Sequence, residues 1–91
     1  MAEVAKRVRV TGRVQGVWFR AWTRERAEAL GLRGWVRNEA DGSVAALIAG
    51  PEAAVARMLG ELGQGPPAAA VARVEAEDAE PPAGPGFAVL R

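Results

Sequence analysis

The feature that most limits the possible folds is the hydrophobic period of the chain, which changes between two and about 3.6 residues along its length. In residues 4–14, VAKRVRVTGRV, the apolar Val8 and Val10 alternate with arginines, as in a half-buried strand. Residues 19–30 then combine good helix formers with a broad apolar face, and Gly31 supplies a stop signal. The chain therefore begins with a strand followed by a helix.

A hairpin and a second helix follow. Residues 32–38 and 43–50 are apolar runs around the Asp41-Gly42 pair, which favours a hairpin because glycine accepts a positive φ. Beyond them, Pro51 occupies a first-turn position of a helix that ends before Gly63. The expected core positions of that helix are Val55, Met58, Leu59 and Leu62.

The last third of the chain predicts two more strands. In residues 70–77, AVARVEAE, we expect Ala72, Val74 and Ala76 to face inward and the charged residues to face water. A loop rich in proline and glycine then precedes a short strand over residues 87–90.

This order, βαββαβ with an extra C-terminal strand, is that of a ferredoxin-like α/β sandwich, an α+β fold with two helices on one face of a mixed, largely antiparallel sheet. The 91 residues suffice for a single domain spanning residues 1–91. A right-handed crossover makes the first two strands parallel, with the third between them. Their carboxyl ends then meet, so Arg20 and Asn38 can face one pocket. Trp35, in the second strand, is predicted to lie in the core.

The side-chain inventory excludes several kinds of chemistry. The chain has no cysteine, histidine or tyrosine, and its only lysine and serine are Lys6 and Ser43. Disulfides, Ser-His and Cys-His nucleophiles and histidine-bound zinc are therefore impossible. No apolar run approaches the roughly 20 residues of a membrane span, and no secretory signal precedes the first strand, so we expect a soluble, cytoplasmic protein.

Charge is unevenly distributed along the chain. Residues 1–38 contain nine basic and three acidic residues, whereas residues 39–91 contain three basic and eight acidic ones. The first part therefore favours an anionic partner. Solvated strand and helix faces would give the same pattern.

The segment GRVQGVWFR, residues 12–20, joins the first strand to the first helix. A glycine-bearing turn before a helix leaves backbone N–H groups without partners, and an arginine in the first helical turn can bind phosphate with two parallel hydrogen bonds. The segment thus predicts an anion site at Gly16 and Arg20. Alternatively, Gly12 and Gly16 serve only a tight turn, and Arg20 is solvated.

Two long segments, VTGRVQGVWFR (10–20) and GWVRNEADGSVAALIAG (34–50), strongly resemble the signature segments of the acylphosphatase family. The resemblance extends over the whole chain and implies hydrolysis of the carboxyl–phosphate bond of acyl phosphates, with no metal and no cofactor. It implies that Arg20 is catalytic and that the side chain of Asn38 holds the attacking water. It also implies that the phosphoryl oxygens are bound by the backbone N–H groups of Gln15, Gly16, Val17, Trp18 and Phe19.

Two features of the chain fall outside that assignment. The side chain of Trp18 stands at a variable position of the family and receives no role. Ala45 stands where an acidic residue is often found, outside the expected pocket. Glu39 and Asp41 are near Asn38 and are candidate bases, although a solvated hairpin is the simpler interpretation.

The expected partner is a small acyl phosphate, or inorganic phosphate or a sulfate-like anion, and the protein is expected to be a monomer without nucleic-acid or membrane partners. RNA binding is disfavoured because the first and third strands offer Val8, Val10, Val44 and Ile48 instead of aromatic residues. The alternative function is a non-catalytic small-anion-binding or sensor module on the same fold.

Overall fold

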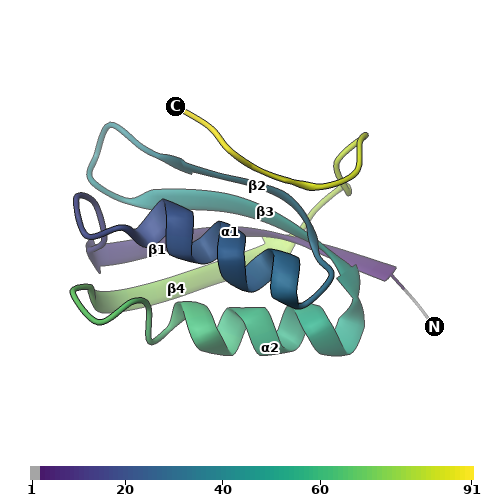
Figure 1. Cartoon of the computed structure of the whole chain (residues 1–91), viewed down its shortest axis with the longest axis horizontal. Coiled ribbons are helices and arrows are strands. Elements are labelled where there is room, and N and C mark those ends of the chain that lie inside the picture. Colours follow the sequence, from purple (N-terminus) through teal and green to yellow (C-terminus); the bar gives the residue numbers. More distant parts are fainter. Residues whose placement is uncertain (1–2) are drawn as a thin grey trace.

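A computed structural model of the protein describes residues 3–91 and contains two helices packed against one face of a five-stranded sheet (Figure 1). The elements in chain order are β1 (Glu3–Arg13), α1 (Phe19–Ala29), β2 (Arg33–Asn38), β3 (Val44–Pro51), α2 (Glu52–Leu62), β4 (Ala70–Asp78) and β5 (Phe87–Val89). The predicted ferredoxin-like α+β arrangement is confirmed. Pro51 precedes α2 as its N-cap instead of lying in the first turn.

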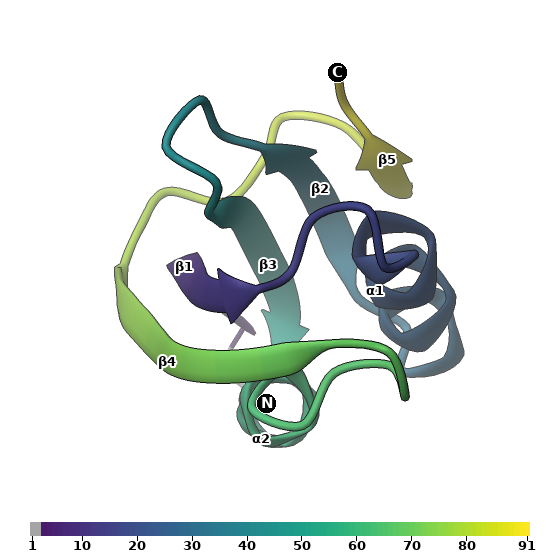
Figure 2. The same ribbon diagram turned by 90° about the vertical axis from the view of Figure 1, so that its left-hand side faces the viewer.

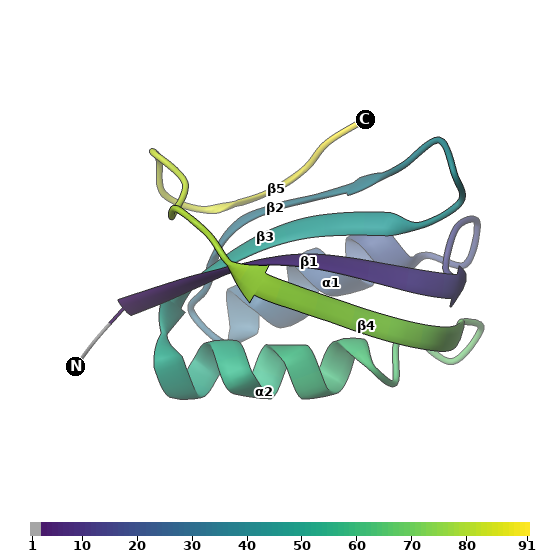
Figure 3. The same ribbon diagram turned by 180° about the vertical axis from the view of Figure 1, so that it is seen from behind.

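The sheet has the strand order β4-β1-β3-β2-β5. The β1–β3, β2–β3 and β1–β4 pairs are antiparallel, while β5 runs parallel to β2. Strands β1 and β2 are therefore parallel, with β3 between them, as the right-handed crossover requires. Figure 3 shows the face of the sheet that the helices leave open. Neither helix of the described residues is long and apolar enough to cross a membrane.

The core lies between the sheet and the two helices. Val8 and Val10 are each 1% exposed, as their alternation predicted, and they pack in one cluster with Phe19 of α1. From α2, Val55, Met58 and Leu62 are buried and Leu59 is partly buried. The helical spacing of apolar residues in α2 therefore identified its core-facing side.

Trp35 is not in the core, contrary to the prediction. It is partly buried on the open face of the sheet, where the guanidinium of Arg37 lies 4.7 Å from the ring centroid. The reason is the pleat of the strand: Gly34 and Val36 are buried, so the residue between them points the opposite way. Stacking under an arginine covers part of the indole without placing it in the core.

The reason given above for disfavouring RNA binding used residues that are not on the open face. Val8, Val10, Val44 and Ile48 are all buried in the core cluster, so they do not describe the surface that a nucleic acid would meet. By strand register, the open face of β1 and β3 carries Arg7 opposite Leu47 and Arg9 opposite Ala45.

Gly12 explains an irregularity between β1 and β4. Its φ is +116°, and a Cβ at this position would lie 2.4 Å from the carbonyl oxygen of Ala70. The register between the two strands shifts at this glycine, as in a β-bulge. Beyond the shift Val71 is partly buried, so the predicted alternation of β4 is confirmed for Val74 only; Ala72 and Ala76 are exposed.

Candidate active site

The loop between β1 and α1 lies at the end of the sheet where β2 also finishes (Figure 2). The side chain of Gln15 anchors this loop to a neighbouring part of the chain. Its Nε2 donates hydrogen bonds to the carbonyl oxygens of Glu39, at 2.8 Å, and Ser43, at 2.9 Å, both in the β2–β3 hairpin. The loop is thus held by a side chain, and its own backbone donors stay available.

Gly16 has a different role from Gly12. Its φ is +73°, a left-handed conformation that favours glycine, and no atom lies within 4 Å of the position that a Cβ would occupy. Gly12 is required by close packing, whereas Gly16 combines a left-handed turn with open space in front of it. Of the two glycines, only Gly16 lines a pocket with Arg20.

The loop presents unpaired backbone donors. Within residues 3–91, the N–H groups of Gln15, Gly16, Val17 and Trp18 donate to no protein acceptor. Helix α1 begins at Phe19, and the N–H groups of its first turn have no acceptor within the helix. Together with the positive end of the helix dipole, these donors form a candidate cradle that could hold an anion.

This cradle borders a pocket of about 230 Å³ lined by Val14, Gly16, Trp18, Phe19, Arg20, Ala21, Asn38 and Val89. The structure thus brings Arg20 and Asn38 together, as the parallel arrangement of β1 and β2 predicted. Gln15 and Val17 belong to the same loop but do not line the pocket. Val89 was missed by sequence reasoning, because nothing local indicates that the short β5 pairs beside β2.

Arg20 has no carboxylate partner among the described residues. Its Nη1 donates only to the carbonyl oxygen of Leu90, at 3.3 Å. Five other basic residues of the N-terminal part form ion pairs: Lys6–Asp78, Arg9–Asp41, Arg26–Glu61, Arg33–Glu3 and Arg37–Glu39. The fold therefore neutralises much of the N-terminal positive charge and leaves the charge of Arg20 available in the pocket.

Asn38 carries an unsatisfied group. Its Oδ1 is buried and accepts no hydrogen bond from any described residue. Such an orphan acceptor costs about 1–3 kcal/mol of desolvation without a compensating bond. A turn of the carboxamide toward the pocket would let this oxygen accept a hydrogen bond from water.

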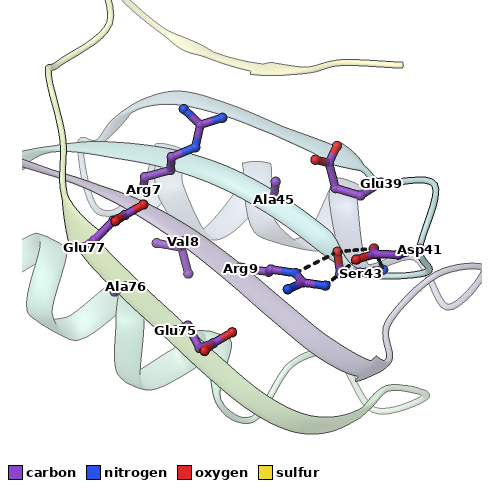
Figure 4. A pocket seen from close by; sticks show the side chains of 10 residues that line it. All are labelled: Arg7, Val8, Arg9, Glu39, Asp41, Ser43, Ala45, Glu75, Ala76 and Glu77. Atoms are coloured by element: carbon purple, nitrogen blue, oxygen red, sulfur yellow. Dashed lines mark hydrogen bonds and ion pairs between the residues drawn. The ribbon is translucent and has the colours of Figure 1, made fainter.

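A second and larger pocket, of about 610 Å³, lies on the open face of the sheet (Figure 4). Several of its charged groups form ion pairs, whereas Arg7 and Glu77 form none within residues 3–91. Arg9 forms an ion pair with Asp41 and donates to the hydroxyl of Ser43 at 3.3 Å. Hydrogen bonds from the hydroxyl and the backbone N–H of Ser43, assisted by Arg9, hold the pKa of Asp41 below its usual value.

The two carboxylates considered as bases belong to this second pocket. Glu39 accepts a hydrogen bond from Arg37 at 2.9 Å, and both Glu39 and Asp41 line the open-face pocket instead of the one at Arg20. Ala45 also lines the open-face pocket. Ala45 is therefore outside the pocket at Arg20, as expected.

The fold and the site together place the protein in one structural class. Its members are ferredoxin-like sandwiches with an arginine and unpaired backbone N–H groups where the first strand joins the first helix. Residues 6–89 match the family model for acylphosphatase. The chain is 66% identical to an acylphosphatase of Rhizobium meliloti over 87 residues, covering 92% of this chain and 90% of that protein. The chain belongs to the acylphosphatase family.

Solved structures agree with this assignment. An acylphosphatase from Coxiella burnetii is 38% identical with a TM-score of 0.93, the match covering 97% of this chain and 93% of that one. An acylphosphatase from Bacillus subtilis is 32% identical with a TM-score of 0.91, and the match covers 97% of this chain and 99% of that one.

Proposed function

We propose that residues 1–91 act as one domain that hydrolyses acyl phosphates to a carboxylate and inorganic phosphate. Membership of the acylphosphatase family supports the reaction. The observation that carries the assignment of residues is the shared pocket of Arg20 and Asn38 beside a loop with unpaired N–H groups.

In this proposal the phosphoryl group occupies the cradle. The backbone N–H groups from Gln15 to Phe19 and the guanidinium of Arg20 donate to its three non-bridging oxygens, which carry the charge in the transition state. An arginine stays protonated throughout and can contact two oxygens at once. Because no carboxylate among residues 3–91 pairs with Arg20, the site retains its attraction for a dianion.

The attacking water is assigned to Asn38. Its side-chain oxygen accepts a hydrogen bond from the water molecule. This bond orients a lone pair of the water oxygen toward phosphorus, in line with the bond that breaks. The water oxygen forms the new P–O bond, the electrons of the old bond leave on the acyl oxygen, and a phosphate oxygen takes the water proton. This substrate-assisted transfer requires no protein base.

The leaving group explains why few reactive side chains suffice. A carboxylic acid has a pKa of roughly 4–5, so the acyl group departs as a carboxylate without a general acid. Positioning and charge stabilisation then supply most of the catalysis. We therefore propose metal-independent turnover, in keeping with a chain that lacks histidine and cysteine.

Benzoyl phosphate hydrolysis with and without a chelator tests the function, and the Arg20→Ala variant tests the site. Loss of one transition-state donor costs about 10²–10³ in turnover, and binding of inorganic phosphate should weaken as well. Arg24→Ala is the matched control because Arg24 lies one turn further along α1 and is exposed. Equal activity of the two variants would remove Arg20 from the mechanism. Phosphate binding without turnover in the unmodified protein would instead indicate a sensor.

A further inference from the structure

Exposed apolar surface gathers around the pocket at Arg20. Among the described residues, the large hydrophobic side chains that are exposed are Trp18 at 59%, Val89 at 37% and Leu90 at 36%. Trp18 and Val89 both line the pocket, and the carbonyl of Leu90 accepts the hydrogen bond from Arg20. A charged, amide-rich cradle is therefore bordered by apolar side chains.

Trp18 occupies its position at a cost to stability. Its φ of +67° makes it the only non-glycine residue with a positive φ in residues 3–91. A bulky residue in this region is strained, by about 1–2 kcal/mol. Trp18 is also the N-cap of α1, where serine, threonine, aspartate or asparagine would hydrogen-bond to the helix, and it supplies no such bond.

The indole of Trp18 makes few packing contacts that could offset this strain. It does not belong to the core cluster or to the partly buried residues packed against that cluster within residues 3–91. The aromatic contact formed in this region is between Phe19 and Trp22, with ring centroids 5.5 Å apart. A strained, exposed tryptophan beside a pocket is better explained by a ligand contact than by folding.

An acyl phosphate has a second half that the cradle does not bind. If the phosphoryl group is held by the loop donors and Arg20, the acyl group would extend toward Trp18 and Val89, the exposed apolar side chains that line the same pocket. We propose that Trp18, assisted by Val89, is an acyl-binding surface that makes the enzyme prefer acyl phosphates with flat or branched apolar acyl groups over acetyl phosphate. This inference rests on the proposed function.

The test compares kcat/KM for benzoyl phosphate and acetyl phosphate in the unmodified protein, Trp18→Asn and Trp18→Phe. Asparagine tolerates the left-handed backbone and caps helices, so Trp18→Asn should fold. The benzoyl-to-acetyl ratio should fall about tenfold in Trp18→Asn and stay within about threefold in Trp18→Phe, since a contact of this size discriminates by about an order of magnitude. Trp35→Leu, which removes an indole from the open face, should leave the ratio within about twofold.

Two results would overturn the inference. The first is a benzoyl-to-acetyl ratio of kcat/KM near one in the unmodified protein. The second is an unchanged ratio in Trp18→Asn, with activity toward both substrates reduced by the same factor. Failure of the proposed function looks different, because the unmodified protein would then hydrolyse neither substrate. Thermal unfolding of each variant checks that a changed ratio belongs to a folded protein.

Discussion

The two pockets of this molecule differ in how many of their polar groups have partners, and the larger pocket is not the one with more unpaired groups. The open-face pocket is more than twice as large as the pocket at Arg20, yet Arg9 and Asp41 in it satisfy each other (Figure 4). Within residues 3–91, the smaller pocket contains an arginine without a carboxylate partner, loop amides without acceptors and a buried amide oxygen without a donor.

This difference teaches that unsatisfied groups mark a site better than volume does. A paired charge presents little field to a ligand, and a ligand that displaces its partner must replace the lost bonds. Unpaired donors beside a guanidinium could instead bind an anion without breaking an ion pair, so little reorganisation would be needed on binding. The contrast can be tested by changing matched residues in the two pockets.

Among the comparisons between the two pockets, Asn38→Ala should have the largest effect. We expect kcat for benzoyl phosphate to fall about 10²–10³-fold while competitive inhibition by inorganic phosphate changes little, because Asn38 is assigned to water and not to the phosphoryl group. The melting temperature should stay the same or rise, since the substitution removes a buried unpaired oxygen. Asp41→Asn, in the other pocket, should retain kcat within about twofold. A loss confined to phosphate binding would contradict the role of Asn38.

Gly16→Ala should have an intermediate effect and has a close control in Gly42→Ala. Both glycines have positive φ values, +73° and +93°, and both face open space, so each substitution should cost about 1 kcal/mol of backbone strain. Only the methyl group at position 16 stands beside the cradle. We expect kcat/KM to fall about tenfold in Gly16→Ala and to change little in Gly42→Ala, with similar losses of melting temperature. Equal kinetics in the two variants would show that the loop does not approach the ligand.

The smallest effect should be the contribution of Asp41, in the open-face pocket, to the pH dependence of stability. Bonds from Ser43 and Arg9 favour ionised Asp41 and lower its pKa in the folded state. Its contribution is therefore complete above the unfolded pKa of roughly 3.9 and disappears as the pH falls through the lower folded value. Thermal unfolding between pH 7 and 2.5 should show a steeper acid loss for the unmodified protein than for Asp41→Asn. Parallel curves would mean that this pairing does not survive in solution.

Much of the architecture was predictable because it depends on local periodicity. The alternation of Val8 and Val10, the spacing of Val55 and Met58 and the Asp41-Gly42 pair each specify an element within a few residues of chain. Connection rules then placed the third strand between the first two, which are parallel. The prediction for Trp35 was wrong because hydrophobicity alone does not say which side of a strand faces the helices.

The candidate site was predictable only in part, for the same reason. Arg20 and Asn38 were placed together because parallel strands end at one edge of a sheet. The contribution of Val89 depends on β5 pairing beside β2, which no local pattern specifies. The left-handed backbone of Trp18 likewise has no sequence signal, because tryptophan is not a residue that favours this conformation.

The amino-acid sequence by itself determined the succession of strands and helices, the chemistry that the chain can and cannot perform, and its resemblance to a family. Only the tertiary structure decided which charges remain free. Arg9 and Arg20 are the same residue type, yet Arg9 on β1 is neutralised by Asp41 of the β2–β3 hairpin and Arg20 lines an open pocket. Pairing between distant residues depends on which strands become neighbours, and that information exists only once the sheet has formed.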